Sequence, residues 1–456
     1  MEEMKNCMLD KFAEYVLSSS YSKMPLSVRK AIQGCMAYNF FCAFAGSRLP
    51  WSLAACVVSD QGSGPSTIWP SLKRTTVTDA AFANAALGQS VLNEDFHLTS
   101  VTHPGSVSFA SLISVGEMLH SSGEEVLGAA VVAYDVIGKI GRAMWTDEFR
   151  SKGFRPTGIF GPIGCAAGCA KLMGLDHEKT RNAMALACNC SSSLREWAHA
   201  GTSDIYFHNA AAAAAGVKCA LLAREGVTAP KTMLEGKAGL IQAYSGLSGI
   251  ERLEAELPML GAVYEVENTF FKPYPTCGSV AHIAQIALKI HEEDRIDPER
   301  ITRIVVGTHK HGKINPGCDN KGTYAGIAQA QMSNQFAVAS ALVYGEVTID
   351  RYINYQDPII NRLTSLTEVE LDNECERAYP QQRRGWVKVF LDNGKSIEKA
   401  KPDLDVVLTP LDHANIIAKL RLSINKVFGE NKSADILRSI ERFEDLDDVS
   451  RLFPEN

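Results

Sequence analysis

The stretch from Asn93 to Gly105 holds a high density of side chains that can carry protons. Two imidazoles, those of His97 and His103, stand there with the carboxylates of Glu94 and Asp95 and with threonine hydroxyls. Imidazole titrates near neutral pH, so a histidine in such a stretch can act as a general acid or base. The residues therefore indicate either a catalytic loop held between two helices or a polar helix connection in which His-Pro-Gly marks a turn.

A second group of reactive side chains precedes a helix, rich in Ala, Gly and Cys, that we expect from Ile163 to Met173. Segment 153–162 is rich in glycine and proline and carries Arg155 and Thr157. The start of a helix has unpaired amides and partial positive charge, so it can bind an anion, and a guanidinium and a hydroxyl just upstream add to this. The alternative is a glycine-rich turn that permits close packing, and the sequence leaves both open.

A third group lies in segment 270–278, where two prolines favour an extended backbone that then opens a helix carrying His282. Lys272 and Tyr274 belong to this segment. Lys272 offers a positive charge for a carboxylate, and the alternative is a solvated surface lysine.

His208 stands just before six alanines, residues 210–215. A run of alanines lets two helix backbones approach closely, so we expect this helix to lie against another in the core or at a subunit contact. His208 either faces a cavity or is a hydrogen-bonded core histidine.

Composition narrows the kind of ligand. The chain has 456 residues, 46% of them hydrophobic and 21% charged, with a net charge of -6. It lacks the basic clusters that bind nucleic acid or anionic membranes, so we expect a small-molecule ligand, no nucleic acid and no membrane. Residues 1–5 do not resemble a signal peptide, and the apolar segments 31–45 and 210–223 are too short or too interrupted to span a bilayer, which predicts a cytoplasmic protein.

The 12 cysteines are scattered through the chain and are typical of reduced, buried side chains. Cys165 and Cys169 stand one helical turn apart, and Cys188 and Cys190 form a close pair. Because the Cys-x-x-Cys spacing of closed metal sites is absent, we predict no metal.

Hydrophobic periodicity predicts a mainly helical chain. A capping residue at Thr78 or Asp79 is expected to open the helix that precedes the histidine-rich stretch. The predicted helices are 9–17, 26–45, 79–92, 106–119, 123–140, 163–173, 178–188, 210–223, 329–344 and a set within 411–443.

The middle of the chain differs from both ends. Residues 301–308 and 386–391 alternate as strands do, and the second run turns at Asp392-Asn393-Gly394. A further short strand is expected at 66–70. We therefore predict a helical domain from 1–267 and 400–456, with a small α+β domain, 268–399, inserted between its parts.

The order of motifs resembles the MmgE/PrpD family, which includes 2-methylcitrate dehydratase, cis-aconitate decarboxylase and iminodisuccinate epimerase. The resemblance spans nearly the whole chain. Its carriers are segment 79–86, the His103-Pro104-Gly105 turn, segment 153–158, segment 172–176, and Lys272-Pro273-Tyr274-Pro275-Thr276-Cys277, which is the most specific.

The resemblance implies a mainly α fold: a large all-helical domain built from both chain ends plus a smaller α+β lid domain. It also implies a homodimer and cofactor-independent, metal-free chemistry on a small di- or tricarboxylate, in a cleft between the domains. By this resemblance His103 is the leading acid–base residue and Asp95 or His97 a second proton carrier, whereas Lys272 and Arg155 hold carboxylates. Thr157, His208 and Tyr274 are the further candidates for substrate binding.

The chain departs from the family pattern at several positions. Only one acidic residue of the usual pair is kept in the stretch 93–97. Arg155 stands where the family tends to have histidine, Ile205 where it tends to have lysine, and Cys318 in a region where decarboxylating relatives use tyrosine.

The resemblance implies one shared step, removal of a proton α to a carboxylate. The first functional hypothesis is a lyase that dehydrates a 2-methylcitrate-like acid. The alternatives are an epimerase of a dicarboxylate such as iminodisuccinate, a cis-aconitate decarboxylase, and an inactive homologue that binds carboxylates.

Overall fold

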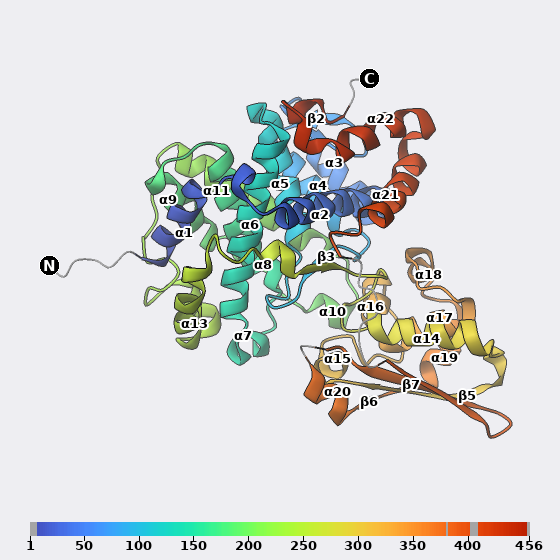
Figure 1. Ribbon diagram of the computed structural model, residues 1–456. Coiled ribbons are helices and arrows are strands. Elements are labelled where there is room, and N and C mark those ends of the chain that lie inside the picture. The colour runs from blue at the N-terminus through green and yellow to red at the C-terminus, as the bar shows by residue number, and fades with distance from the viewer. Residues whose placement is uncertain (1–6, 380–381, 402–408, 454–456) are drawn as a thin grey trace. The chain divides into compact units, whose positions relative to one another are not determined.

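The computed structural model describes residues 7–379, 382–401 and 409–453. The chain divides into two compact units, which are drawn in Figure 1. The helical unit comprises residues 1–194, 206–271 and 408–456, and the α+β unit comprises residues 195–205 and 272–407. Segment 195–205, which the sequence analysis leaves in the helical domain, thus groups with the α+β unit. Residues 1–5, on which the signal-peptide prediction rests, lie outside the described residues.

The helical unit is built mainly of α-helices, with two short two-stranded ribbons, β1–β2 and β3–β4. The ribbons are an addition to the predicted all-helical domain. Its helices are α1 (Met8–Ser18), α2 (Leu26–Ala45), α3 (Pro50–Ser59), α4 (Val77–Gln89), α5 (Pro104–Leu119), α6 (Gly123–Met144), α7 (Asp147–Ser151), α8 (Pro156–Leu172), α9 (His177–Cys188), α11 (Ile205–Arg224), α12 (Leu240–Ser245), α13 (Ser248–Glu256), α21 (His413–Phe428) and α22 (Glu430–Glu441), and its strands are β1 (Ser66–Ile68), β2 (Lys73–Thr75), β3 (Asp95–His97) and β4 (Thr269–Phe271).

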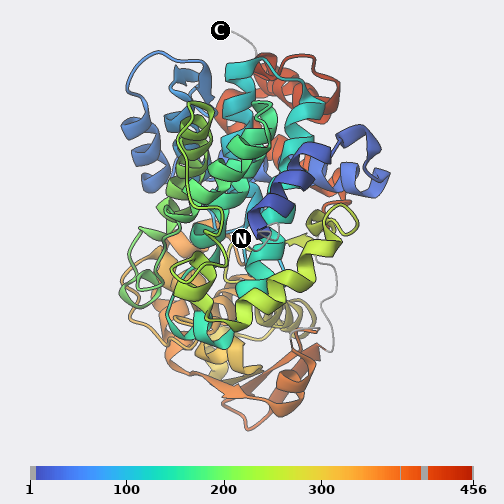
Figure 2. The ribbon, with the colours of Figure 1, turned by 90° about the vertical axis from the view of Figure 1, so that its left-hand side faces the viewer.

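Helices α5, α6 and α8 pack against one another in the core of this unit (Figure 1 and Figure 2). Glycines allow the close approach, since a Cβ added at Gly164 of α8 lies 2.7 Å from the carbonyl oxygen of Ala133 in α6. Helix α11 also packs against α8, where a Cβ added at Gly216 lies 2.4 Å from Cβ of Cys165. The expectation that the alanine-rich helix lies closely against another helix is therefore confirmed.

The two ends of the chain meet in the helical unit, as predicted. Helix α21 packs against α2. A Cβ added at Gly34 of α2 lies only 1.9 Å from the carbonyl oxygen of Pro410, so glycine is required at that crossing.

Two predicted helix starts are wrong. Thr76, not Thr78 or Asp79, caps α4, because its side chain accepts a hydrogen bond from the Asp79 amide at 3.2 Å. Helix α8 begins at Pro156 rather than Ile163 and carries Pro162 inside it. Proline is favourable in the first helical turn, where its missing N–H costs nothing. The predicted breaker-rich loop therefore ends at Arg155, which is the N-cap residue.

The α+β unit contains a four-stranded sheet in the order β6-β5-β7-β8, in which β5 and β6 are parallel and the other pairs antiparallel. Helices α14 and α17 pack together, α14 against β7 and β8 and α17 against β6. The predicted turn at Asp392–Gly394 joins β7 and β8. The elements are α10 (Trp197–Ala200), α14 (Ala281–Asp294), β5 (Ile301–Thr308), α15 (Lys310–Ile314), α16 (Ile327–Met332), α17 (Asn334–Tyr344), α18 (Ile349–Ile353), α19 (Pro358–Ser365), β6 (Thr367–Leu371), α20 (Asn373–Ala378), β7 (Gly385–Leu391) and β8 (Ser396–Lys401).

The single helix predicted for 329–344 is two helices. Helix α16 ends at Met332, and Ser333 caps α17 by accepting a hydrogen bond from the Phe336 amide at 3.1 Å. A serine hydroxyl at this position satisfies an amide that the start of a helix leaves unpaired, so it favours a new helix over continuation.

The expectation that the alanine-rich segment is too short to span a bilayer needs correction. Helix α11 has 20 residues and, among the described helices, meets the criteria of length and composition for a membrane span. However, 56% of its apolar window is buried inside the protein, as in a core helix. The bent pair α2 and α3 meets the same criteria only when taken together across a bend of 100°.

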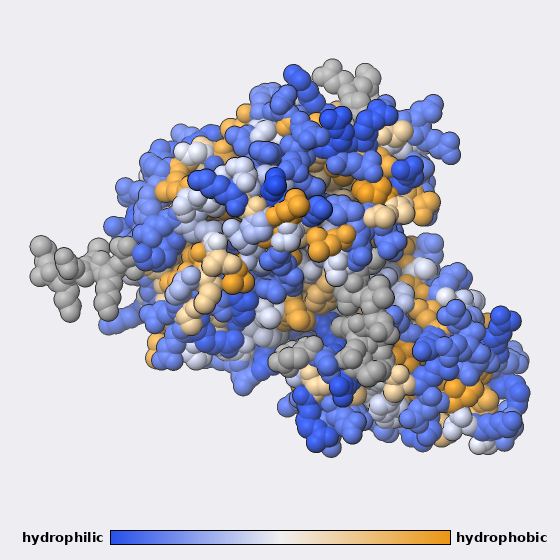
Figure 3. All heavy atoms as spheres, viewed as in Figure 1, coloured by the Kyte–Doolittle hydropathy of each residue, from blue (hydrophilic) through white to orange (hydrophobic). Residues whose placement is uncertain are grey.

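Exposed apolar side chains occur singly or in small groups. Figure 3 shows hydrophobic residues in small groups among hydrophilic ones on the face in view. Val57, at 71% exposure, shares α3 with the exposed Leu53 and Val58, whereas Leu247, at 69%, directly precedes α13. Single exposed apolar residues are normal on protein surfaces.

Candidate active site

A short ribbon orders the histidine-rich stretch. Strand β3 pairs antiparallel with β4, so that Asp95 lies opposite Phe271 and His97 opposite Thr269. The ring of Phe271 stacks on Tyr38 with centroids 3.8 Å apart, which ties the ribbon to α2. Lys272 directly follows Phe271 in the chain and is the first residue of its segment of the α+β unit. Neither strand is evident from the sequence, because each has three residues and depends on the other.

The imidazole of His103 is oriented by main chain. Its Nδ1 lies 2.7 Å from the carbonyl oxygen of Asp95, and 3.5 Å from a carboxylate oxygen of the buried Glu94. A carbonyl oxygen can only accept, so Nδ1 carries the hydrogen, and Nε2 is the basic nitrogen of the neutral ring. The His103 amide donates to Oγ1 of Thr157 at 3.1 Å. With 15% of its side chain exposed, His103 combines fixed orientation with access.

Asp95 anchors the turn that follows His103. Its two carboxylate oxygens accept from the Gly105 amide at 3.1 and 3.0 Å, and Oδ2 also accepts from the Tyr134 hydroxyl at 2.8 Å. An anion bonded to an amide in the first turn of α5 is stabilised by the positive end of the helix. A Cβ added at Gly105 would lie 2.8 Å from Asp95, so the turn requires glycine. These contacts indicate a positioning role, and the role of second proton carrier stays a prediction.

His97 lies in a buried network of charges. Its Nδ1 lies 2.6 Å from the Ser100 hydroxyl, and its Nε2 lies 2.9 Å from a carboxylate oxygen of Glu265. Lys139 and Arg142 donate to the same carboxylate. Burial by itself raises the pKa of Glu265, but the hydrogen bond and charge of His97 and the charge of Lys139 hold that pKa well below its usual range. His97 is fully buried and braces Glu265, whereas its predicted proton-carrier role remains untested.

Arg155 and Thr157 lie at the N-terminal end of α8. The guanidinium of Arg155 donates through Nη1 to the amide oxygens of Asn209 at 2.8 Å and Gln89 at 3.4 Å. Asn209 in turn donates to Ser106 at 2.6 Å. The two amides orient the guanidinium without bringing a negative charge to it.

Asn209 and Gln89 are site residues that the sequence analysis missed. Asn209 directly follows His208 on α11, and Gln89 is the last residue of α4. In the sequence, these two residues are marked only as polar side chains near the end of an apolar helix. His208 itself is half-buried on α11, and Ile205 is the first residue of that helix.

Two predicted site residues belong to the α+β unit. Lys272 is buried, with 4% exposure, and Tyr274 is half-buried, with burial raising the pKa of its phenol. Because Lys272 is almost fully buried, it is not a solvated surface lysine. Its role as a carboxylate anchor stays a prediction, as does the substrate contact of Tyr274.

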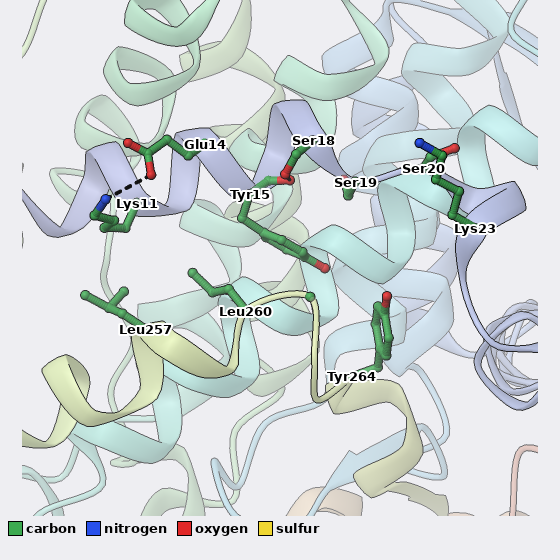
Figure 4. Close-up of a pocket in the computed structure, with 11 residues that line it drawn as sticks. Lys11, Glu14, Tyr15, Ser18, Ser19, Ser20, Lys23, Leu257, Leu260 and Tyr264 are labelled. Carbon is green, nitrogen blue, oxygen red and sulfur yellow. Dashed lines mark hydrogen bonds and ion pairs between the residues drawn. The ribbon is translucent and has the colours of Figure 1, made fainter.

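A separate groove of about 400 Å³ opens in the helical unit between α1 and segment 257–264 (Figure 4). Lys11 at its rim pairs with Glu14 at 3.0 Å, and Tyr15 reaches inward to bond Asp135. None of the predicted site residues lines it. Among the described residues, no group of three or more His, Cys, Asp or Glu side chains is arranged to hold a metal ion.

The fold is mainly α, with a helical unit made from both ends of the chain and an α+β unit inserted in sequence. The candidate site adds an imidazole that is fixed by main chain. The chain belongs to the MmgE/PrpD family: the model of the family's N-terminal domain matches residues 10–253, and that of its C-terminal domain matches residues 274–445. The family and the mainly α fold expected from the sequence motifs are thereby confirmed.

Proteins named for cis-aconitate decarboxylase are among those to which this chain is similar. Cis-aconitate decarboxylase of Aspergillus terreus is 22% identical, over 90% of this chain and 88% of the relative. Cis-aconitate decarboxylase-like protein oryM of Aspergillus oryzae is 24% identical, over 94% and 93%. Cis-aconitate decarboxylase of Homo sapiens is 24% identical, over 85% and 81%. These similarities support a lyase-like enzyme.

Proposed function

We propose that this protein is a lyase acting on a small tricarboxylate, and that His103 moves the proton at a carbon α to a carboxylate. The observation that carries the proposal is the 2.7 Å contact between Nδ1 of His103 and the carbonyl of Asp95, which makes Nε2 the proton-transfer atom. The names of the relatives support the substrate class, since alignment extends over most of both chains.

Charge stabilisation is the second requirement of this chemistry. A carbanion next to a carboxylate is costly unless cations lie nearby. Asn209 accepts a hydrogen bond from Arg155, which is the N-cap residue of α8. Thr157, two residues later, accepts a hydrogen bond from the His103 amide. We assign Arg155 to a substrate carboxylate, with the partial positive charge of the helix start adding to its effect. The role of Lys272 as an anchor for a further carboxylate stays a prediction from the sequence motif.

Decarboxylation and dehydration demand opposite protonation states of His103. In decarboxylation of cis-aconitate, the carbon–carboxyl bond breaks, carbon dioxide leaves, and the electron pair shifts through the double bond to a carbon that takes a proton from imidazolium. In dehydration of a 2-methylcitrate-like acid, neutral imidazole takes the carbon-bound proton and hydroxide leaves from the neighbouring carbon. We favour decarboxylation because the named relatives are cis-aconitate decarboxylases.

Three assays on the purified protein test the proposal. Carbon dioxide release from cis-aconitate supports decarboxylation, whereas a new absorbance from a conjugated double bond supports dehydration of 2-methylcitrate. Solvent deuterium incorporation with changed optical rotation of a dicarboxylate reports epimerisation and contradicts a lyase. Absence of turnover across all these acids contradicts the proposal and favours a carboxylate-binding protein.

The pH profile gives an independent test at saturating substrate. If imidazolium donates the proton, kcat falls as pH rises through the titration of the ring. If neutral imidazole accepts it, kcat falls as pH drops. Two further properties stay predictions. Turnover that persists after dialysis against EDTA would support metal-free chemistry, and a particle mass of two chains in light scattering would support a homodimer.

A further inference from the structure

Two cysteines far apart in sequence meet in the α+β unit. Sγ of Cys318, in the loop after α15, lies 3.9 Å from Sγ of Cys277, which stands just before α14. The side-chain amide of Asn315 lies against both sulfurs, 3.4 Å from Cys318 and 3.8 Å from Cys277. Arg195 donates to the oxygen of that amide at 3.1 Å, which fixes the direction in which its N–H groups point. Both cysteines are free thiols.

The surroundings divide the pair into a thiolate and a thiol. Hydrogen bonding from Cys318 lowers the pKa of Cys277 to about 6 against the effect of burial, and the Ser279 amide, Lys272 and Arg383 contribute. The same hydrogen bond and burial raise the pKa of Cys318 well above its ordinary value. Arg383 is itself fixed beside the pair, since it donates to the carbonyl of Gly278 at 2.7 Å.

Access also differs between the two sulfurs. Cys277 is half-buried, and Cys318 is fully buried. The more exposed cysteine is therefore the one whose pKa is lowered, and the thiolate is the form that attacks an electrophile. The buried sulfur stands at the distance from which a second thiol can resolve the product.

A second close pair in the helical unit provides a comparison. Sγ of Cys190 lies 3.8 Å from Sγ of Cys219, almost the same separation. Burial and the neighbouring Cys190 raise the pKa of Cys219 to about 12. The two pairs are therefore almost equally close. Cations and an amide donor contribute to the lowered pKa of Cys277, whereas the pKa of Cys219 is raised by burial and by Cys190.

We propose that Cys277 and Cys318 form an oxidant-reactive dithiol site that reduces hydrogen peroxide and closes as a disulfide. The Cys277 thiolate attacks one peroxide oxygen, the O–O bond breaks, and hydroxide leaves, so Cys277 becomes a sulfenic acid. Cys318 then gives its proton to hydroxide, and its sulfur attacks that of Cys277. The S–O bond breaks, and the second oxygen leaves as hydroxide, which takes up from solvent the proton that Cys277 released on ionising. Two thiols and one peroxide thereby yield one disulfide and two waters.

Closure requires a modest movement. The two sulfurs must approach from 3.9 Å to the roughly 2 Å of a disulfide. Cys318 lies in the connection between α15 and α16, and Gly317 beside it has φ +83°. A connection outside regular helix can absorb such a shift more readily than α14 can.

The experiment treats the reduced, full-length protein with excess hydrogen peroxide, blocks remaining thiols with N-ethylmaleimide, and digests it without reductant. Mass spectrometry is expected to show a peptide linked through Cys277 and Cys318, which dithiothreitol separates. In Cys318→Ser, dimedone should trap a sulfenic acid at Cys277. In Cys277→Ser, oxidation of Cys318 should fall at least tenfold.

Cys190 and Cys219 serve as the matched internal control, because their separation is the same. Formation of their disulfide as fast as the Cys277–Cys318 disulfide would overturn the proposal, since reactivity would then follow distance alone. Failure to link Cys277 and Cys318 in wild-type protein would also overturn it. Circular dichroism melting shows whether each variant is folded, and the wild-type result stands without the variants. The readout is independent of lyase activity.

Discussion

His97 ends strand β3 and His103 precedes helix α5 six residues later, and the two histidines have opposite surroundings. His97 is fully buried, with Ser100 at one ring nitrogen and Glu265 at the other. His103 keeps 15% exposure, and its Nδ1 is anchored to a backbone carbonyl. We predict that His97, held by a buried carboxylate, supports the architecture, whereas the more exposed His103 exchanges protons. The partners, not the residue type, separate the two roles.

The largest expected effect is that of His103→Ala on turnover. One general acid–base group contributes about 10²- to 10⁴-fold in rate, so kcat should fall by at least the lower of these factors. The melting temperature should remain near that of the wild type, because the partly exposed His103 ring makes one hydrogen bond to main chain rather than filling the core. Wild-type turnover in the variant would remove His103 from the proposed mechanism.

His97→Ala should show the reverse pattern. Removing the His97 ring takes one hydrogen-bond partner from the buried Glu265 carboxylate and one from the Ser100 hydroxyl, at a cost of about 1 to 3 kcal/mol, so the midpoint of urea unfolding should drop. Turnover per folded molecule should change far less than in His103→Ala. Ser100→Ala is the control, since it removes only the hydroxyl at Nδ1. A normal unfolding midpoint with a large loss of kcat would exchange the roles assigned to the two histidines.

The buried network around Glu265 should make the stability of the protein depend on pH. The pKa of Glu265 is lowered in the folded protein, so its carboxylate contributes stability above the pKa of an unfolded glutamate, and this contribution is lost as pH falls toward the folded value. Glu265→Gln should therefore be destabilised relative to wild type at pH 7, with the difference shrinking below about pH 4.5. Urea midpoints measured from pH 7 to pH 3 check this, and a difference that grows on acidification would contradict it.

Lys272→Ala extends the comparison to the α+β unit. If the buried ammonium holds a carboxylate, KM should rise about tenfold, corresponding to about 1.4 kcal/mol. Lys272→Arg, which keeps the charge, should recover part of the loss. Unchanged KM and kcat in Lys272→Ala would mean that this residue only supports its proline-rich segment.

Asp95→Asn has the smallest expected effect. The amide still offers an oxygen to Gly105 but lacks the charge that favours the helix start, so the cost should be about 0.5 to 2 kcal/mol in unfolding free energy. Because His103 is anchored to the backbone of this residue rather than to its carboxylate, kcat should fall less than tenfold. A loss as large as that of His103→Ala would support Asp95 as a proton carrier.

Local patterns were sufficient for the fold class and for segments whose structure depends on near neighbours. The strand at 301–308 and the turn at Asp392–Gly394 are examples. The start of α8 was misplaced because Pro162 and the glycines indicate a loop locally, whereas their use is close packing against α6 and α11. Tertiary packing overrode local propensity there.

The candidate site was predictable in its residue types and not in its contacts. His103, Arg155 and Lys272 were found from chemistry and motif. The bracing role of His97 depends on Glu265, which is 168 residues away in sequence, and the orientation of Arg155 depends on Asn209. No local pattern specifies partners at such separations. The roles of these residues in turnover await the measurements above.

The backbone anchor of His103 has a consequence for altering substrate preference. A carbonyl group is present whatever side chain its residue bears, so the hydrogen bond at Nδ1 of His103 does not depend on the side chain of residue 95. Residues that contact a bound acid can therefore be exchanged to admit a different molecule while the proton-transfer atom keeps its direction. A scaffold of this kind separates choice of substrate from handling of the proton.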